Sequence, residues 1–166
     1  MMKTFKEYLV ENDFVSLAGK TARPWKTTQV YKVALNGVIQ PGDKVLDYGS
    51  GPYQNVKPSV LELGAEYYPY DAYGNIGKLT SNNDVVMASN VLNVAVKAAD
   101  PIAEYNRALD EMTSALSPDG TLVVNMPTSG PRADWMSPSQ LGEDLMKRFN
   151  AVKRANRETF IARGPK

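Results

Sequence analysis

The chain of 166 residues contains neither cysteine nor histidine. Without cysteine it has no disulfide, no thiolate nucleophile and no cysteine-ligated metal site. Without histidine it has no histidine-dependent triad and no imidazole zinc site, so acid–base catalysis would fall to Asp, Glu, Lys or Tyr. We therefore expect no metal site, and a chemistry that needs little proton transfer.

Long apolar runs are also missing. No segment approaches the length that spans a bilayer, and Lys3, Lys6 and Glu7 interrupt the stretch where a signal peptide would begin. Hydrophobic residues make up 43% and charged residues 22% of the chain, which is ordinary for a globular protein. We expect a cytoplasmic protein without membrane contact, folded as a single domain over residues 1–166.

The net charge is only +1, but positive charge is concentrated in two segments. Residues 147–166 have a local balance of +6 and residues 19–32 one of +4, which leaves −9 for the remainder. Such asymmetry can mark a surface for phosphates or nucleic acid. A solvated face on a C-terminal hairpin is the simpler explanation of the tail alone, and the nucleic-acid interpretation gains if the two segments meet in space.

Helix-like and strand-like segments alternate along the chain. Helices are predicted at residues 4–11, 27–38, 58–63, 101–116 and 137–149. Strands are predicted at residues 44–48, 65–70, 84–88, 121–125, 150–155 and 158–163. This alternation predicts an α/β fold with a mostly parallel sheet, helices on both faces and a C-terminal antiparallel hairpin.

Three local patterns sharpen this assignment. The helix after Asp100 has Pro101 at its first position and an apolar stripe that includes Ile102 and Tyr105. Residues 117–120, Ser-Pro-Asp-Gly, predict a turn between this helix and the next strand. Ser137 begins a capping-box pattern at the last helix.

Polar residues follow three of the predicted strands, where ligands bind in an open parallel sheet. The first group is Asp47 to Gly51, a strand running into two glycines. Asp71 comes 22 residues after Gly49 and ends the second strand, and Ser89 with Asn90 ends the third. Glycines let a backbone approach a ligand closely, and an acid at the next strand end accepts hydrogen bonds from ribose hydroxyls.

The glycine spacing discriminates between nucleotide-like ligands. A dinucleotide fingerprint needs a third glycine, but Gln54 stands at that position. Asp47 precedes the glycines, where it would repel a phosphate and suit a cationic or amine-bearing group. An adenosine that carries a positively charged sulfonium satisfies both Asp47 and Asp71 without a phosphate site.

Four segments together resemble the class I S-adenosylmethionine-dependent methyltransferases, which have a Rossmann-like three-layer fold. VLDYGSG is similar to the first family motif and YYPYDAYG to the second. NDVVMASNVLNV resembles the region after the fourth family strand, and LDEMTSALSPDGTLVVNMP the helix, turn and fifth strand. The resemblance covers roughly residues 40–130, so residues 1–40 become an N-terminal helical cap and residues 41–166 the Rossmann-like core.

The resemblance implies S-adenosylmethionine as cofactor and direct displacement of its methyl group onto an unidentified acceptor. Asp47 and the glycines would wrap the methionine part, Asp71 would bind the ribose, and the residues after Asp71 would flank the adenine. Asn90 and Asn93 are the candidates for orienting the acceptor. The implied cofactor-binding residues are Asp47, Tyr48, Gly49, Ser50, Gly51, Tyr53, Asp71, Ala72, Tyr73, Ser89, Asn90 and Val91.

Substrate contacts are predicted in two loops. Arg23 and Lys26 lie in a segment that mixes cations, hydroxyls and an aromatic, and Trp135 lies in a segment after the fourth strand. A surface loop and a plain linker are the alternatives. A phosphate-loop interpretation of Gly19-Lys20-Thr21 is rejected because Phe14 stands where that pattern needs glycine.

The chain departs from the family pattern in the middle. Only twelve residues lie between Asp71 and Asp84, where the family fits a helix, a strand and a second helix. We therefore expect a reduced member without an edge strand and its helix, whose open edge would suit an oligomer. Residues 90–93 also do not match the Asn/Asp-Pro-Pro-aromatic motif of amino-directed DNA methyltransferases.

Two other functions remain open on the same residues. In the first alternative, the chain is a non-catalytic or regulatory protein of the same fold that binds a ligand or nucleic acid. Alternatively it would cleave S-adenosylmethionine instead of transferring its methyl group.

Overall fold

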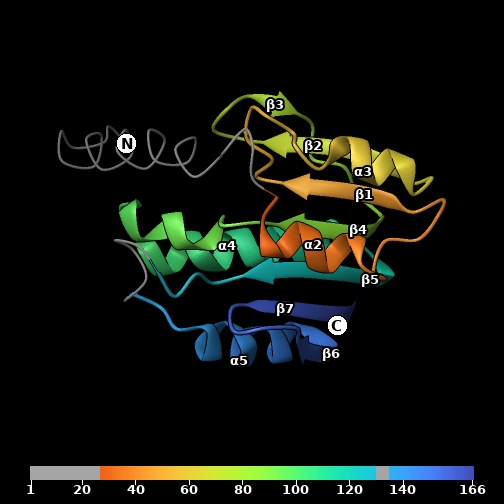
Figure 1. The fold of residues 1–166 in the computed structure, drawn as a ribbon. Helices are drawn as coiled ribbons and strands as arrows, with labels where there is room; N and C mark the ends of the chain where they lie inside the picture. The colour runs from red at the N-terminus through yellow and green to blue at the C-terminus, as the bar shows by residue number, and fades with distance from the viewer. Residues whose placement is uncertain (1–26, 130–134) are drawn as a thin grey trace.

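The structure is a computed structural model that describes residues 27–129 and 135–166. Its seven strands form one sheet in the order β3-β2-β1-β4-β5-β7-β6 (Figure 1). The strands are β1 (Lys44–Tyr48), β2 (Glu66–Asp71), β3 (Ile76–Gly77), β4 (Asn83–Ala88), β5 (Leu116–Asn125), β6 (Phe149–Arg154) and β7 (Thr159–Pro165). The helices are α2 (Gln29–Leu35), α3 (Lys57–Glu62), the 3-10 helix η2 (Leu92–Lys97), α4 (Pro101–Ser114) and α5 (Pro138–Arg148). Among the described residues no helix is long and apolar enough to cross a membrane.

The centre of the sheet is parallel and its margins are antiparallel. β1 pairs in parallel with β2 and β4, and β4 pairs in parallel with β5. β7 pairs antiparallel with both β5 and β6. The predicted α/β fold with a C-terminal hairpin is confirmed, and the carboxyl ends of β1, β2 and β4 meet at one edge.

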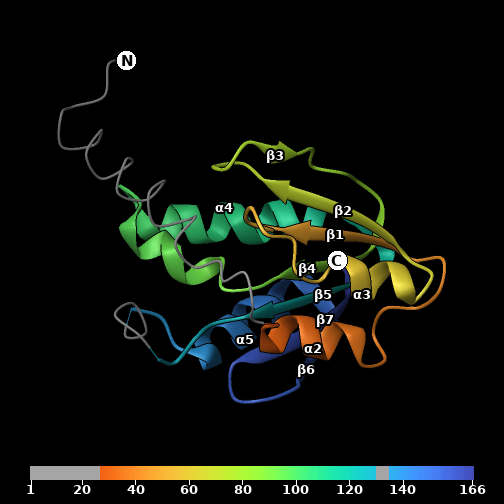
Figure 2. The ribbon, with the colours of Figure 1, turned by 45° about the horizontal axis from the view of Figure 1, so that its top comes forward.

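Two apolar cores hold helices against opposite faces of this sheet. Val30 of α2 and Val60 of α3 pack with Val45 and Val85 on one face. The other core contains Leu46 together with buried residues of η2, α4 and α5. Figure 2 shows α2 and α4 on opposite sides of β4 and β5, so the predicted three layers are present.

Capping residues fix where α4 and α5, the two longest helices described, begin. Asp100 accepts a hydrogen bond from the backbone N–H of Ala103, and Pro101 occupies the first position of α4. Ser137 caps α5 in the same way by accepting from the N–H of Gln140 at 3.1 Å. Both predicted helix starts are confirmed.

Three sequence expectations differ from the structure. The helix predicted over residues 27–38 ends at Leu35, because Gly37 with φ of 94° turns the chain out of the helix. Residues 117–120, predicted as a turn before the strand, lie inside the bounds of β5. The register between β4 and β5 shifts at this point. Ile102 does not join the buried stripe of α4, since it is 54% exposed.

The segment between β2 and β4 is reduced, as expected, and contains no helix. Its one strand is the two-residue β3, which was not predicted and pairs antiparallel with the end of β2. Gly77 makes this pairing possible, because it has φ of 61° and a Cβ there would lie 1.9 Å from the carbonyl oxygen of Pro69.

Asn83 forms hydrogen bonds that link the segment between β2 and β4 to the C-terminal end of α4. Its amide donates to the carbonyl oxygens of Thr80 at 2.9 Å and Ala115 at 2.7 Å, and it accepts from the Thr80 hydroxyl at 2.8 Å. Asn83→Ala is expected to lower the free energy of unfolding by about 2 kcal/mol, because buried partners lose their hydrogen bonds. Urea denaturation measures this, with exposed Ser81→Ala as the control. Equal stability losses in both variants would contradict the role of Asn83.

Candidate functional site

The loop after β1 is shaped by its two glycines. Gly49 and Gly51 have φ of 73° and 64°, in the left-handed region that glycine adopts without strain. The N–H groups of Gly49 and Ser50 donate to the carbonyl oxygen of Tyr70 at 2.7 and 3.1 Å, so the loop folds over the end of β2. A Cβ on Gly49 would lie 2.5 Å from Cγ2 of Val91, so any other residue at this position would have to displace the Val91 side chain.

Asp71 joins this loop to the segment after β2. Its carboxylate accepts from the N–H of Gly51 at 3.2 Å, of Tyr73 at 3.1 Å and of Gly74 at 2.9 Å. The two sequence-predicted strand ends therefore touch. Since β1 lies between β2 and β4, this contact lies where the strand order changes direction, which is where ligands bind in such sheets.

A narrow cavity of about 50 Å³ opens beside this contact. Seven sequence-predicted site residues line it: Tyr48, Gly49, Asp71, Ala72, Tyr73, Asn90 and Val91. Seven other predicted site residues that the structure describes do not line it: Asp47, Ser50, Gly51, Tyr53, Ser89, Asn93 and Trp135. The remaining wall comes from Tyr70, from η2 and from α4.

The wall from α4 is a charged pair that sequence reasoning missed. Arg107 donates to Glu104 at 2.7 Å and to Glu111 at 3.1 Å, and the Tyr73 hydroxyl donates to Glu104 at 2.9 Å. Burial alone would raise the pKa of Glu104, but hydrogen bonds from Arg107 and Tyr73 outweigh it and hold the pKa below its usual value. Tyr73 and Glu104 both line the cavity, and their hydrogen bond joins the segment after β2 to α4.

Asp47 lies on the α2 side of the sheet and is fully buried. The hydroxyl of Tyr31 on α2 donates to it at 3.0 Å and that of Tyr67 on β2 at 2.5 Å. Burial raises the pKa of Asp47 to about 6, although the two tyrosine hydrogen bonds favour the charged form. Both carboxylate oxygens are thus used within the protein, and Asp47 anchors β1 directly before the glycine loop.

The end of β4 is tied to its neighbours by side chains. Asn90, with φ of 57°, donates its N–H to Asn125 Oδ1 at 2.8 Å, and Asn125 Nδ2 donates back to Asn90 Oδ1 at 2.8 Å. Ser89 donates to Thr28 at 2.6 Å. Asn125 was missed, although it ends β5 as Asn90 follows β4, and that signal was present in the sequence.

The other predicted site residues lie apart from the cavity. Asn93 is 7% exposed, and its Oδ1 has no hydrogen-bond partner among the described residues. Tyr53 is 51% exposed. Trp135 packs on α4 against Tyr105. Arg23 and Lys26, like the helix predicted at residues 4–11, fall outside the described residues.

Comparison with known proteins reveals the fold alone. No protein-family model and no curated protein matches the chain. The fold is similar to that of a methyltransferase from Aquifex aeolicus that depends on S-adenosylmethionine, with a TM-score of 0.60 and 17% identity over 90% of this chain and 97% of that one.

Two methyltransferase structures with a bound ligand resemble the fold of this chain to a similar degree. One is magnesium protoporphyrin IX methyltransferase from Synechocystis with bound S-adenosylmethionine, with a TM-score of 0.58 and 17% identity over 100% of this chain and 99% of that one. The other is 1,6-didemethyltoxoflavin-N1-methyltransferase from Burkholderia thailandensis with S-adenosylhomocysteine, with a TM-score of 0.62 and 16% identity over 100% and 92%. The chain therefore has the fold of the class I S-adenosylmethionine-dependent methyltransferases.

Proposed function

We propose that the protein binds S-adenosylmethionine across the carboxyl ends of β1, β2 and β4 and transfers its methyl group to an acceptor. When bound, this sulfonium compound supplies an electrophilic methyl group. The contact between Gly51 and Asp71 carries the proposal, because it joins a tight glycine loop to an acid that can bind a ribose. The shared fold of enzymes crystallised with S-adenosylmethionine or its product supports it.

The residues of the cavity fit the adenosine half of this ligand. The two carboxylate oxygens of Asp71 offer about four acceptor positions, and three backbone N–H groups use three of them, which leaves one for a ribose hydroxyl. Tyr70, Ala72 and Val91 supply apolar and aromatic surface for a base. Ligand cavities commonly measure roughly 300–1,000 Å³, so Tyr73 and Glu104 must separate when the ligand enters.

The chain's own contribution to methyl transfer would be alignment. Asn90 lines the cavity and is held by two hydrogen bonds to Asn125, so it is a positioned polar group at the end of β4. A group held in this way orients an acceptor without adding or removing a proton. This agrees with a chain that has no histidine and no cysteine.

Calorimetry with S-adenosylmethionine and S-adenosylhomocysteine tests the proposal. Both ligands are expected to bind, and Asp71→Asn to weaken each about tenfold, because an amide replaces a charged acceptor. Asp119→Asn, which removes an exposed carboxylate in β5, is the matched control and should bind like the wild type. Absence of binding by both ligands would contradict the proposal, and equal affinity of Asp71→Asn would contradict the site.

A non-catalytic ligand-binding protein is the second candidate. The small cavity and the internal use of Asp71 favour it, because both limit the room for cofactor and acceptor together. Chromatography after incubation with S-adenosylmethionine and an added acceptor, such as a nucleic-acid duplex, separates the alternatives. S-adenosylhomocysteine appears if the methyl group is transferred to that acceptor, methylthioadenosine appears if the ligand is cleaved, and unchanged ligand excludes both cleavage and transfer to the acceptor supplied.

Nucleic acid stays a proposal for the acceptor. Within the basic segment 147–166, Lys147 pairs with Asp144 at 2.9 Å and Arg148 with Asp110 at 3.0 Å. These two cations are therefore partly neutralised, while Lys153, Arg157 and others of the segment are exposed. Salt-dependent retention of an arbitrary duplex would support this acceptor class.

A further inference from the structure

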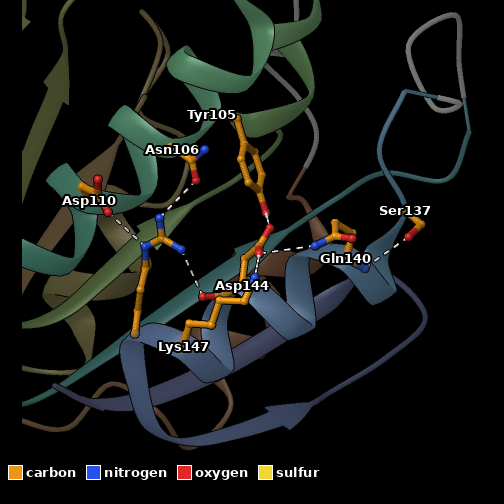
Figure 3. Close-up of polar contacts among 8 residues, drawn as sticks. Tyr105, Asn106, Asp110, Ser137, Gln140, Asp144 and Lys147 are labelled. Carbon is orange, nitrogen blue, oxygen red and sulfur yellow. Dashed lines mark hydrogen bonds and ion pairs between the residues drawn. The ribbon is translucent and has the colours of Figure 1, made fainter.

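The basic residues of the C-terminal segment fall into two groups that differ in their partners. On α5, Lys147 pairs with Asp144 at 2.9 Å and Arg148 with Asp110 at 3.0 Å (Figure 3). The guanidinium of Arg148 also donates to Asn106 at 3.1 Å. The charges of these two cations are therefore neutralised within the protein, and an external anion would have to displace their partners.

The second group lies on β6, on β7 and in the turn between them, and its cations have no such partners. The side chains of Lys153, Arg157 and Arg163 are exposed, and none of them forms a hydrogen bond or ion pair with the described residues. β6 and β7 contain no acidic residue. The acid of the turn, Glu158, accepts hydrogen bonds from the N–H and the hydroxyl of Thr128. The hairpin thus presents positive charge that the described residues do not neutralise.

Lys153 and Arg163 lie on the face of the sheet that α2 covers at β4 and β5. Val123 of β5 belongs to the core under α2, and it pairs with Ile161 of β7. Residues that are directly opposite in antiparallel strands share a face, as do residues two apart along one strand. Lys153 pairs with Ile161, and Arg163 is two residues from it, so both cations lie on this side of the sheet.

The other basic segment, residues 19–32, adds to the charge on this side. Of its four cations only Lys32 lies within the described part of the chain, on α2, where it is exposed. Val30 and Ala34 hold α2 against the same face of the sheet. Lys32 therefore extends the positive charge from the hairpin toward the middle of the sheet.

The three hairpin cations form a row along the hairpin. Arg163 lies opposite Thr121, Lys153 lies two positions further along, and Arg157 follows in the turn. This turn lies at the carboxyl end of β5, where Asn125 pairs with the first residue of β7. A row of cations fits a chain of phosphates, whereas a single small anion is bound by cations that converge on one point.

The neighbouring side chains on this face decide between polyanions. Ala151 and Ile161 lie beside the cations, and neither is aromatic. Unpaired bases are bound largely by stacking on aromatic rings, and membrane surfaces are bound by large apolar side chains that insert among the lipids. Ile161 is half-buried in the sheet. The face therefore suits the phosphates of a duplex, which cations alone can bind.

We propose that this face of β6 and β7 binds the phosphate backbone of a nucleic-acid duplex through Lys153, Arg157 and Arg163. Contacts to phosphates carry no sequence information, so the binding does not depend on base sequence. It requires neither S-adenosylmethionine nor methyl transfer, and so goes beyond the proposed function. The row ends at the edge of the sheet that also carries the proposed cofactor site.

Fluorescence anisotropy of a labelled DNA duplex of about 20 base pairs tests the proposal, with the full chain, no S-adenosylmethionine and about 50–200 mM salt. Three phosphate contacts predict a slope of about −2.7 for the logarithm of affinity against that of salt concentration. Arg163→Gln and Lys153→Gln are each expected to reduce the size of this slope by about 0.9. Each should bind about eightfold more weakly at about 0.1 M salt, because one phosphate contact is lost.

Lys147→Gln is the matched control, because it removes the same charge from an exposed but paired position on α5. It should bind the duplex like the wild type, and urea denaturation should show that all three variants are folded. Absence of saturable duplex binding, equal weakening by Lys147→Gln, unchanged affinity in both hairpin variants, or tighter binding of the corresponding single strand would each overturn the proposal. Retention on phosphatidylserine vesicles without duplex binding would overturn it in favour of a membrane surface. Duplex binding of the predicted kind by a chain that does not bind S-adenosylhomocysteine would support it and contradict the proposed function alone.

Discussion

Replacing Gly49 with alanine is expected to lower the free energy of unfolding by about 3 kcal/mol and to weaken S-adenosylmethionine binding more than tenfold. Gly49 has φ of 73°, where a side chain costs roughly 1–2 kcal/mol. The added Cβ would also lie 2.5 Å from Val91, and relieving such overpacking costs roughly 1–3 kcal/mol. Because Val91 lines the cavity, this displacement changes the binding site directly. Urea denaturation and calorimetry measure the two effects.

Gly42→Ala is the matched control for Gly49→Ala. Gly42 has φ of 87°, but no atom lies within 4 Å of the position of its Cβ. It precedes β1, at the end of the strand opposite to the cavity. The control is expected to lose roughly 1 kcal/mol through backbone strain alone and to bind ligand normally. If both variants lose the same stability and keep the same affinity, the close approach of Gly49 to Val91 has no role.

Stability is expected to fall as the pH rises through about 6, and Asp47 is the cause. Burial raises the pKa of this carboxyl from 3.8 to about 6, so the folded state holds its proton more tightly than the unfolded state does. The contribution of Asp47 is therefore complete below the unfolded pKa and is lost as the pH passes the folded one. Between pH 4 and pH 8 the loss amounts to about 2 kcal/mol.

Comparison with Asp47→Asn isolates this effect, because all other titrating groups are common to both chains. Glu104 and Asp144, whose pKa values are lowered, act in the opposite direction in both. Urea denaturation should show that the wild type loses about 2 kcal/mol more than Asp47→Asn between the two pH values. Asp119→Asn, at an exposed site, should follow the wild type. Parallel profiles of wild type and Asp47→Asn would refute the role of Asp47.

Local signals were sufficient for the elements that carry their own boundaries. β1 spans Lys44–Tyr48 as predicted, because an apolar run lies between a turn and a glycine loop. α4 and α5 begin after Asp100 and Ser137, because capping residues satisfy helix N–H groups regardless of the rest of the fold. The hairpin of β6 and β7 follows from two runs with a short connection.

The features that the sequence did not predict depend on tertiary contacts. β3 has two residues and forms only because Gly77 lets the chain come close to Pro69, which no periodicity reveals. Residues 117–120 join β5 because β4 lies alongside, although their sequence alone predicts a turn. Ile102 has helical spacing but lies on a part of α4 that the sheet does not cover.

The candidate site likewise contains residues that the sequence predicted and residues that only the folded structure brings together. Gly51 and Asp71 were assigned to one ligand site because the carboxyl ends of neighbouring parallel strands share an edge, and the structure joins them by a hydrogen bond. Glu104 and Arg107 were not, since their place in the cavity depends on how α4 packs across the sheet. The tyrosines that hold Asp47 come from α2 and β2, so only the assembled fold brings them together.

A structure determined with S-adenosylhomocysteine tests the central claim most directly. The account predicts that the ligand lies over Gly49, with a ribose hydroxyl donating to the free acceptor position of Asp71. It also predicts that the hydrogen bond between Tyr73 and Glu104 is broken to widen the cavity. A ligand bound elsewhere, or crystals that bind none at millimolar concentration, would contradict the account.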